Sequence, residues 1–396
     1  MANRREFLHQ AAIAGSGVAL GVNPLHQAQG ATAAKKGTAR AAAALRVLIL
    51  GGTGFIGPHF VQAALERGHK VAVFNRGKAN VDLPAGVEKL VGDRNGQLES
   101  IMGRDWDAVF DLGTFVPNWV RTVGEALQGR VGHYTFVSTS RVYGDKAVSG
   151  TDETAKILEY QGDTDPFSLT GSPPGYMVGM SDGYSAYGAL KVLAEREAER
   201  QFPGKALILR PGTIIGPRDD MFSYWVSRLD KGGEVLAPGN PLNPQQLVDA
   251  RDFAEWAVRA AESRVAGIFN AQGNVIGTAE VFGAIRGAQT SVSELIWVPE
   301  DWLLVNHVQR NELPGWFLSS EDGRKRLSNA KARAAGLTFR PLCATFADTL
   351  DWLRSQPAPG VKLLAWSLER EQQVLAAWRV DRAAWGKAAV AGCEKR

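Results

Sequence analysis

The stretch Leu45–Gly57, LRVLILGGTGFIG, decides the fold that we predict for this chain. Apart from Arg46, its first residues are apolar or nearly so and form a run short enough for a buried parallel strand. A turn with three spaced glycines follows, and the next residues, PHFVQAALERG, have a helical pattern. A strand, a glycine turn and a helix in this order are what a dinucleotide pyrophosphate requires.

Each glycine of this turn has an expected role. Gly51 lets the chain turn sharply, Gly54 lets backbone N–H groups approach the phosphates, and Gly57 lets the helix lie close to the strand. Because the glycines follow a predicted strand and precede a predicted helix, the signal is stronger than a glycine triplet alone. The expected cofactor contacts of the turn are Gly51, Thr53, Gly54, Phe55, Ile56 and Gly57.

The three glycines are spaced as GxxGxxG, in the sequence GGTGFIG. This motif resembles that of the extended branch of the short-chain dehydrogenase/reductase superfamily, whose members are often called NAD-dependent epimerases/dehydratases. Further apolar runs at 71–74, 108–112 and 134–138 alternate with helical patterns, which favours a parallel sheet. We therefore expect an α/β fold, a Rossmann-like doubly wound parallel sheet with a smaller C-terminal substrate lobe.

The end of the second predicted strand bears on the choice between NAD and NADP. It reads Asn75-Arg76-Gly77-Lys78, without the acid that usually binds the adenosine ribose hydroxyls. Arg76 and Lys78 could pair with a 2′-phosphate, so we favour NADP over NAD. The resemblance adds further expected cofactor contacts, which are Asp93 and Arg94 beside the adenine, Gly113 and Thr114 beside the nicotinamide half, and Pro211 in the loop after a later strand.

Two motifs carry the predicted chemistry. In TFVSTSRVYGD the resemblance implies that Thr139 hydrogen-bonds the substrate oxygen, with Ser138 and Ser140 as substitutes. Tyr187 and Lys191 are four residues apart on one predicted helix face, so the ammonium lowers the pKa of the phenol. Tyr187 would exchange a proton with the substrate hydroxyl, and both residues would also contact the cofactor.

Two departures from the family pattern limit what the resemblance implies. Dehydratases of this family have Asp-Glu where this chain has Ser140-Arg141, which argues against dehydration. The interval from Thr139 to Tyr187 is about twice the usual length, so 146–180 reads as an inserted loop that forms either a lid or a surface excursion. Ser140 and Arg218 are the expected substrate contacts.

The first 34 residues read as a leader. Arg4-Arg5 precedes an apolar stretch too short to span a bilayer, which resembles a twin-arginine export signal. The whole chain has 45 basic and 41 acidic side chains; five basic and one acidic lie in residues 1–40, which leaves 40 of each. The body is thus balanced, which gives no support for nucleic-acid binding.

The remaining predictions concern organisation. We expect a leader at 1–34, a Rossmann domain at 45–355 with an interleaved substrate lobe mainly at 212–245 and 275–340, and a helical extension at 356–396. We predict no metal site and no stable membrane insertion. We expect export to the periplasm, with the cytoplasm as the alternative location. From the resemblance we expect a homodimer.

Three functions remain open from the sequence. The first is hydride transfer at a secondary alcohol or ketone carbon of a sugar or sugar derivative, with epimerisation as the net reaction. The second is an NADPH-dependent ketone or flavonoid-type reductase, because a dense set of tryptophans in the C-terminal third could hold a flat ring. The third is a non-catalytic NAD(P)-binding or RNA-associated protein.

Overall fold

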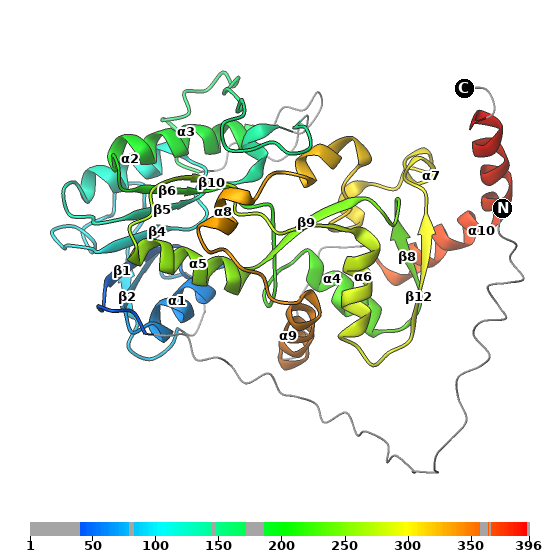
Figure 1. Ribbon diagram of the computed structural model, residues 1–396, viewed down its shortest axis with the longest axis horizontal. Coiled ribbons are helices and arrows are strands. Elements are labelled where there is room, and N and C mark those ends of the chain that lie inside the picture. The colour runs from blue at the N-terminus through cyan, green and yellow to red at the C-terminus, as the bar shows by residue number, and fades with distance from the viewer. Residues whose placement is uncertain are drawn as a thin grey trace, which may run out of the picture. The chain divides into compact units, whose positions relative to one another are not determined.

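Seven parallel strands form the main sheet, with β1 near the middle (Figure 1). The order β10-β6-β5-β4-β1-β2-β3 confirms the predicted doubly wound α/β fold. This computed structural model describes residues 40–78, 83–144, 147–171, 186–356, 363 and 366–393, so the predicted leader lies outside it. The strands are β1 Arg46–Leu50, β2 Lys70–Asn75, β3 Glu88–Val91, β4 Ala108–Asp111, β5 Tyr134–Val137, β6 Ala206–Leu209 and β10 Gly267–Phe269.

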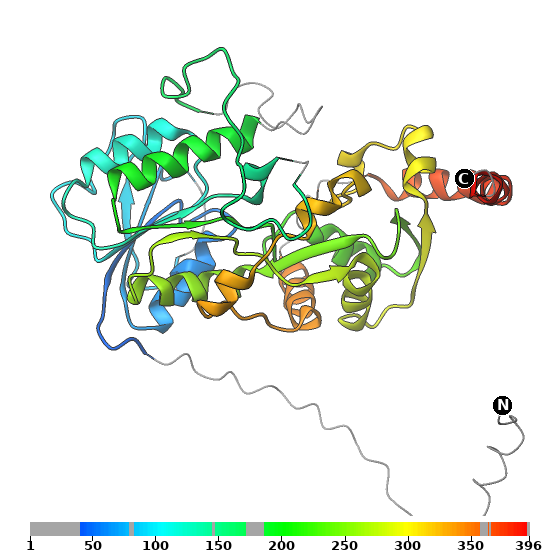
Figure 2. The ribbon, with the colours of Figure 1, turned by 45° about the horizontal axis from the view of Figure 1, so that its top comes forward.

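Helices cover both faces of this sheet (Figures 1 and 2). Alternate residues of β1 face opposite sides, as the period of a strand requires. Val47 and Ile49 pack toward helices α1 and α5, whereas Leu48 and Leu50 pack toward α2 and α3. The helices are α1 Gly57–Glu66, α2 Pro117–Ala126, α3 Ala186–Gln201 and α5 Ala250–Glu262. Strands buried on both faces explain why the sequence shows continuous apolar runs rather than alternation.

A second lobe has its own core. The strands β7 Thr213–Ile215, β9 Pro244–Asp249 and β11 Val275–Gly277 form one small sheet, and β8 Gly233–Pro238 pairs in parallel with β12 Ser293–Val298. The lobe's helices are α4 Phe222–Asp230, α6 Thr278–Gly287, α7 Glu300–Val305 and α9 Leu342–Ser355. Its core is rich in aromatic side chains, among them Trp225, Trp302 and Trp316, all at most 5% exposed.

The chain connects the two lobes several times. After β9 it enters α5 and β10 of the main sheet, and the short helix α8 Ala330–Ala334 also packs on the main core. The last helix, α10 Leu368–Cys393, buries Val374 and Leu375 in the core of the second lobe. Among the described residues, no helix is long and apolar enough to cross a membrane.

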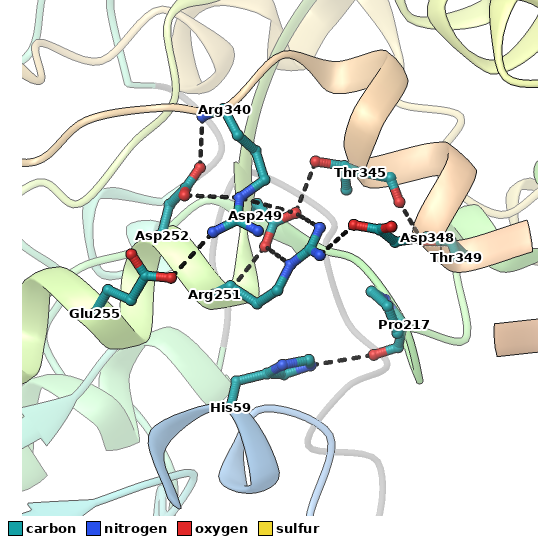
Figure 3. A network of polar contacts seen from close by, with 10 residues as sticks. All are labelled: His59, Pro217, Asp249, Arg251, Asp252, Glu255, Arg340, Thr345, Asp348 and Thr349. Atoms are coloured by element: carbon teal, nitrogen blue, oxygen red, sulfur yellow. Dashed lines mark hydrogen bonds and ion pairs between the residues drawn. The ribbon is translucent and has the colours of Figure 1, made fainter. Parts of the chain in front are cut away.

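A polar network joins the two lobes where β9 meets α5 (Figure 3). Asp249 caps α5 by accepting a hydrogen bond from the backbone N–H of Arg251, and it also pairs with the Arg251 guanidinium. The hydroxyl of Thr345 in α9 donates to Asp249 at 2.7 Å. Asp252, in the first turn of α5, pairs with Arg340 at 2.8 Å. Asp249 therefore links the end of β9 to both α5 and α9.

Candidate active site

The glycine turn has the geometry that a phosphate-binding turn needs. Gly51 has a φ of +88°, a conformation that only glycine adopts easily. A Cβ on Gly57 would lie 2.3 Å from the backbone carbon of Gly52, so α1 can approach β1 this closely only with glycine there. A Cβ on Gly54 would meet only one atom within 4 Å, the carbonyl oxygen of Gly51 at 3.6 Å, so the backbone of Gly54 is open on one side.

This turn borders a cleft of about 690 Å³ at the carboxyl ends of the central strands. Its position is the crevice at which doubly wound folds bind dinucleotides. Of the expected turn contacts, Gly51, Thr53 and Gly54 line the cleft, whereas Phe55, Ile56 and Gly57 are not among its lining residues. The full lining is Gly51, Thr53, Gly54, Phe74, Asn75, Arg76, Lys78, Gly92, Asp93, Arg94, Asn95, Leu112, Gly113, Thr114, Trp119, Thr170 and Gly171.

The end of β2 presents positive charge to this cleft. The amide oxygen of Asn75 accepts a hydrogen bond from the backbone N–H of Gly77 at 2.8 Å, which closes a tight turn. Arg76 and Lys78 on this turn are both exposed and line the cleft. Among the described residues, the part of the cleft at β2 therefore carries two cations and no carboxylate.

Asp93 and Arg94, which follow β3, bond to different partners. The carboxylate of Asp93 accepts the backbone N–H of Asn95 at 2.9 Å. The guanidinium of Arg94 pairs with the buried carboxylate of Asp111 at 2.8 Å, and the Tyr134 hydroxyl donates to Asp111 at 2.7 Å. Arg94 thus lines the cleft with its side chain anchored to the end of β4.

Part of the predicted insertion forms a wall of the cleft. Thr170 and Gly171 line it, and the Asn95 side-chain amide donates to the carbonyl oxygen of Thr170 at 3.1 Å. The indole N–H of Trp119 in α2 donates to the amide oxygen of Asn95 at 2.7 Å. The described insertion residues 147–171 contain no helix or strand, and residues 172–180 lie outside the described chain. The sequence could not reveal these contacts, because they join segments 24 to 75 residues apart.

Thr139, Tyr187 and Lys191 gather next to β5. Thr139 directly precedes the short helix η1 Ser140–Tyr143 and accepts the N–H of Arg141 at 3.3 Å. Lys191 is 1% exposed, donates to the carbonyl oxygen of Val137 at 2.6 Å, and lies 5.9 Å from the ring centre of Tyr187. Burial lowers the pKa of Lys191 to about 7. The two predicted side chains are therefore neighbours on α3.

The catalytic candidates adjoin the cleft without lining it. The ring of Tyr187 lies 5.7 Å from that of Phe115, which directly follows the cleft residue Thr114. The carbonyl oxygen of Pro211, two residues after β6 ends, accepts the backbone N–H of Ser140 at 2.7 Å, and Ser140 is buried. Arg218 has a φ of 78° and directly follows Pro217, whose carbonyl oxygen lies 3.2 Å from a ring nitrogen of His59 in α1. Arg218 thus belongs to a loop that contacts α1.

A glycine allows α3 to approach η1. A Cβ on Gly188 would lie 2.3 Å from the carbonyl oxygen of Arg141, closer than real Cβ atoms come to backbone. This contact holds the helix of Tyr187 and Lys191 against the turn that begins at Thr139. Gly188 was not among the residues predicted for the site, although it stands within the YGALK motif.

We predict that Gly188→Ala displaces α3 and lowers the rate of hydride transfer about a hundredfold, the order of effect expected from a shift of about 1 Å at a catalytic group. Steady-state kinetics would measure it. Gly283→Ala is the matched control, because Gly283 is also helical but has no atom within 4 Å of its Cβ position. The control should keep the rate and gain up to about 1 kcal/mol of stability. Equal rates for both variants would contradict the prediction.

A buried ion pair fixes α3 to the sheet. Glu195, one turn after Lys191, pairs with Arg210 at 2.6 Å, and both side chains are at most 3% exposed. The hydroxyl of Ser138 donates to Glu195, and Arg210 donates to the Tyr143 hydroxyl at 2.9 Å. The network therefore links α3, β5, β6 and η1 around the catalytic candidates. Because the hydroxyl proton of Ser138 is already bonded to Glu195, Thr139 is the better candidate of these two residues for bonding the substrate oxygen.

One cavity of the second lobe is lined mainly by aromatic side chains. Phe222, Trp225, Phe282, Trp316 and Phe317 are among its lining residues, and its volume is about 20 Å³. This is room for about one water molecule, not for a flat ring. The cavity therefore does not favour the flavonoid-type reductase.

Part of the first half of the chain matches a known family model. Residues 47–170 match the model of the NAD dependent epimerase/dehydratase family. No curated protein sequence matches the chain. Among the described residues, no group of His, Cys, Asp or Glu side chains could hold a metal ion.

The fold is also similar to several solved structures. One is the UDP-N-acetylglucosamine 4-epimerase from Methanobrevibacter ruminantium M1, with a TM-score of 0.59 and 18% identity over 79% of this chain and 99% of that chain. Another is the same type of enzyme from Bacillus cereus, with a TM-score of 0.56 and 17% identity over 79% and 100%. The UDP-glucuronic acid 4-epimerase from Bacillus cereus, solved with NAD, has a TM-score of 0.54 and 17% identity over 78% and 98%.

Proposed function

We propose that this chain is an NAD(P)-dependent oxidoreductase or epimerase that acts at a secondary alcohol or ketone carbon of a sugar or sugar derivative. The observation that carries the proposal is the contact of Phe115 with Tyr187, since it joins the glycine-turn cleft to the Thr139, Tyr187 and Lys191 group. The family match over residues 47–170 supports a dinucleotide in that cleft. The similar structures solved with NAD support it as well.

The residues of the chain fit such a cofactor. Gly54 offers open backbone near the N-terminus of α1, where phosphates bind well. A bound nicotinamide supplies hydride acceptance and return. Thr139 orients the substrate oxygen, Tyr187 takes and returns its proton, and Lys191 supplies the positive charge that favours phenolate. Ser140-Arg141 in place of Asp-Glu argues for epimerisation or net redox chemistry and against dehydration.

The proposal is tested by supplying UDP-N-acetylglucosamine and UDP-glucuronic acid, the kinds of sugar named for the similar enzymes. We expect conversion of a sugar to its epimer, or reduction of the cofactor, measured by nuclear magnetic resonance and by absorbance of reduced nicotinamide. A protein that binds the cofactor but converts neither these sugars nor simple ketones would favour the non-catalytic binding function.

We also propose that the cofactor is NADP, because Arg76 and Lys78 line the cleft at β2. Arg76→Asp should weaken binding of NADPH by about tenfold or more, since a charge-assisted hydrogen bond is lost and a like charge is introduced. Binding of NADH should stay the same or improve, which makes it the internal control. Fluorescence titration of both nucleotides measures the two affinities. Equal losses for NADH and NADPH would overturn the NADP assignment.

The remaining proposals concern location and assembly. We propose export through a twin-arginine-type signal in residues 1–34, which would favour a cofactor that is reduced and reoxidised within one turnover. Periplasmic fractionation tests this, and a purely cytoplasmic protein would refute it. We propose a homodimer as the assembly, which sedimentation equilibrium would test.

A further inference from the structure

The insertion between η1 and α3 has no part in the proposed reaction, yet one of its segments is fixed to the cofactor half of the molecule. We name residues 157–171 the wall segment, because Thr170 and Gly171 at its end line the cofactor cleft. All residues of the wall segment are described, and none of them belongs to a helix or strand. Its position therefore depends on contacts with other elements, which are made along its whole length.

The beginning of the wall segment lies against η1 and α3. The backbone N–H of Leu158 donates to the carbonyl oxygen of Val142 in η1 at 2.8 Å. A Cβ on Gly188 would lie 3.1 Å from the Cδ1 of Leu158, so this leucine packs on the first turn of α3. Because Gly188 directly follows Tyr187, the wall segment starts beside the candidate proton-exchanging group.

The middle of the wall segment is anchored by an apolar cluster. Leu169 is 9% exposed and packs with Val116, which directly precedes α2, and with Leu190 of α3. Both of these partners are fully buried, and the ring of Tyr160 packs against the same cluster. Burial of a leucine between two helices resists displacement of the segment, since leaving the cluster would return apolar surface to water.

An aromatic ring provides a second anchor two residues earlier. The guanidinium of Arg121 in α2 lies 3.7 Å from the ring centre of Phe167. Such a cation–π contact is attractive, and Arg121 also pairs with Glu197 of α3 at 3.6 Å. Phe167 is only partly buried, so this anchor is separate from the apolar cluster.

The end of the wall segment reaches the loop after β3. There the side-chain amide of Asn95 donates to the carbonyl oxygen of Thr170 at 3.1 Å, and Trp119 of α2 holds the same Asn95. Asn95, Trp119 and Thr170 all line the cleft, together with Gly51 and Gly54 of the glycine turn. A dinucleotide in the cleft would therefore be bounded by the glycine turn and by a segment that α2 and α3 hold in place.

We propose that the wall segment retains the dinucleotide, because its anchoring on α2 and α3 sets how slowly a bound cofactor leaves the cleft. This rests on the proposed function and deepens it, since a retained cofactor suits epimerisation. In that reaction the substrate carbon gives up a hydride and takes one back, and its oxygen gives up a proton and regains it. No outside reductant is consumed, whereas a net reductase must exchange its spent cofactor at every turnover.

The test is the rate at which the full chain releases a bound reduced nucleotide. The chain is loaded with NADPH, or with NADH if that binds more tightly, and is then mixed with a large excess of the oxidised form. The decay of nicotinamide fluorescence gives the dissociation rate. We expect Leu169→Ala and Phe167→Ala each to raise this rate about tenfold or more, since changes at a binding surface act mainly on dissociation. Phe167→Ala decides the matter if Leu169→Ala does not fold, because Phe167 lies outside the apolar cluster.

Leu350→Ala is the matched control for removing a buried leucine. Leu350 belongs to α9, is 4% exposed and packs in the core of the second lobe. This variant should lose stability and release the cofactor at the unmodified rate. Unchanged release in Leu169→Ala and Phe167→Ala would overturn the proposal. Equally faster release in Leu350→Ala would also overturn it, since general loosening of the fold would then control release.

The same measurement separates this inference from the proposed function. Tyr187→Phe should release the nucleotide at the unmodified rate, even though it loses turnover. A chain that shows the expected release rates but converts no substrate would leave the wall segment assigned and the proposed function refuted. A chain that converts sugars but releases its cofactor faster than it turns over would refute the wall segment alone. A chain that binds neither nucleotide would refute both.

Discussion

Replacing Tyr187 with Phe should lower turnover by about a hundredfold to ten-thousandfold, the usual contribution of one general acid–base group. The phenol is the proton-exchanging group of the proposed reaction, and the ammonium of Lys191 lies 5.9 Å from its ring centre. Because Phe keeps the ring that contacts Phe115, the fold and the cofactor cleft should be unaffected. Turnover and cofactor affinity, measured on the same preparation, would separate loss of chemistry from loss of binding.

Tyr224→Phe provides a control for removing a tyrosine hydroxyl. Tyr224 belongs to α4, and its hydroxyl accepts the indole N–H of Trp366 at 3.0 Å. This variant should lose some stability and keep its rate. Should Tyr187→Phe retain more than about a tenth of the rate, Tyr187 is not the proton-exchanging group.

Replacing Glu195 with Ala should cost about 3–5 kcal/mol of unfolding free energy. The substitution leaves the guanidinium of Arg210 buried without its carboxylate, and it removes the acceptor of Ser138. Since α3 then loses its anchor beside Lys191, the rate should fall together with stability. Urea denaturation measures the first effect and kinetics the second.

Two further variants show whether the ion pair causes this loss. Glu199→Ala, one turn later on an exposed part of α3, should change stability by no more than about 0.5 kcal/mol. The double variant Glu195→Met with Arg210→Met removes both charges and should recover much of the loss. Similar stability for Glu195→Ala and Glu199→Ala would show that the buried pair does not hold α3.

The fold was predictable because its signals are local. The apolar run at Leu48 and Ile49, the glycines at 51, 54 and 57 and the helical pattern after them are contiguous, so one stretch defines strand, turn and helix. The placement of Tyr187 beside Lys191 was equally accessible, because two residues four apart on a helix must be neighbours.

Other parts of the site depend on long-range packing. Thr170 meets Asn95 across the cleft although 75 residues separate them, and no local pattern marks that contact. The pair of Glu195 and Arg210 joins a helix to a strand end, and Asp249 at the end of β9 accepts a hydrogen bond from Thr345 of α9. The short helix η3 Ser319–Lys325 likewise packs on η1, although the two are far apart in the sequence.

The measurement that tests the central claim most directly is mass and absorbance analysis of what the purified protein releases on denaturation. The account predicts a nicotinamide dinucleotide close to one per chain, and the mass of the 2′-phosphate decides between NADP and NAD. A protein that releases none, and that binds neither NADH nor NADPH when they are added, would contradict the assignment of the glycine-turn cleft and the function built on it.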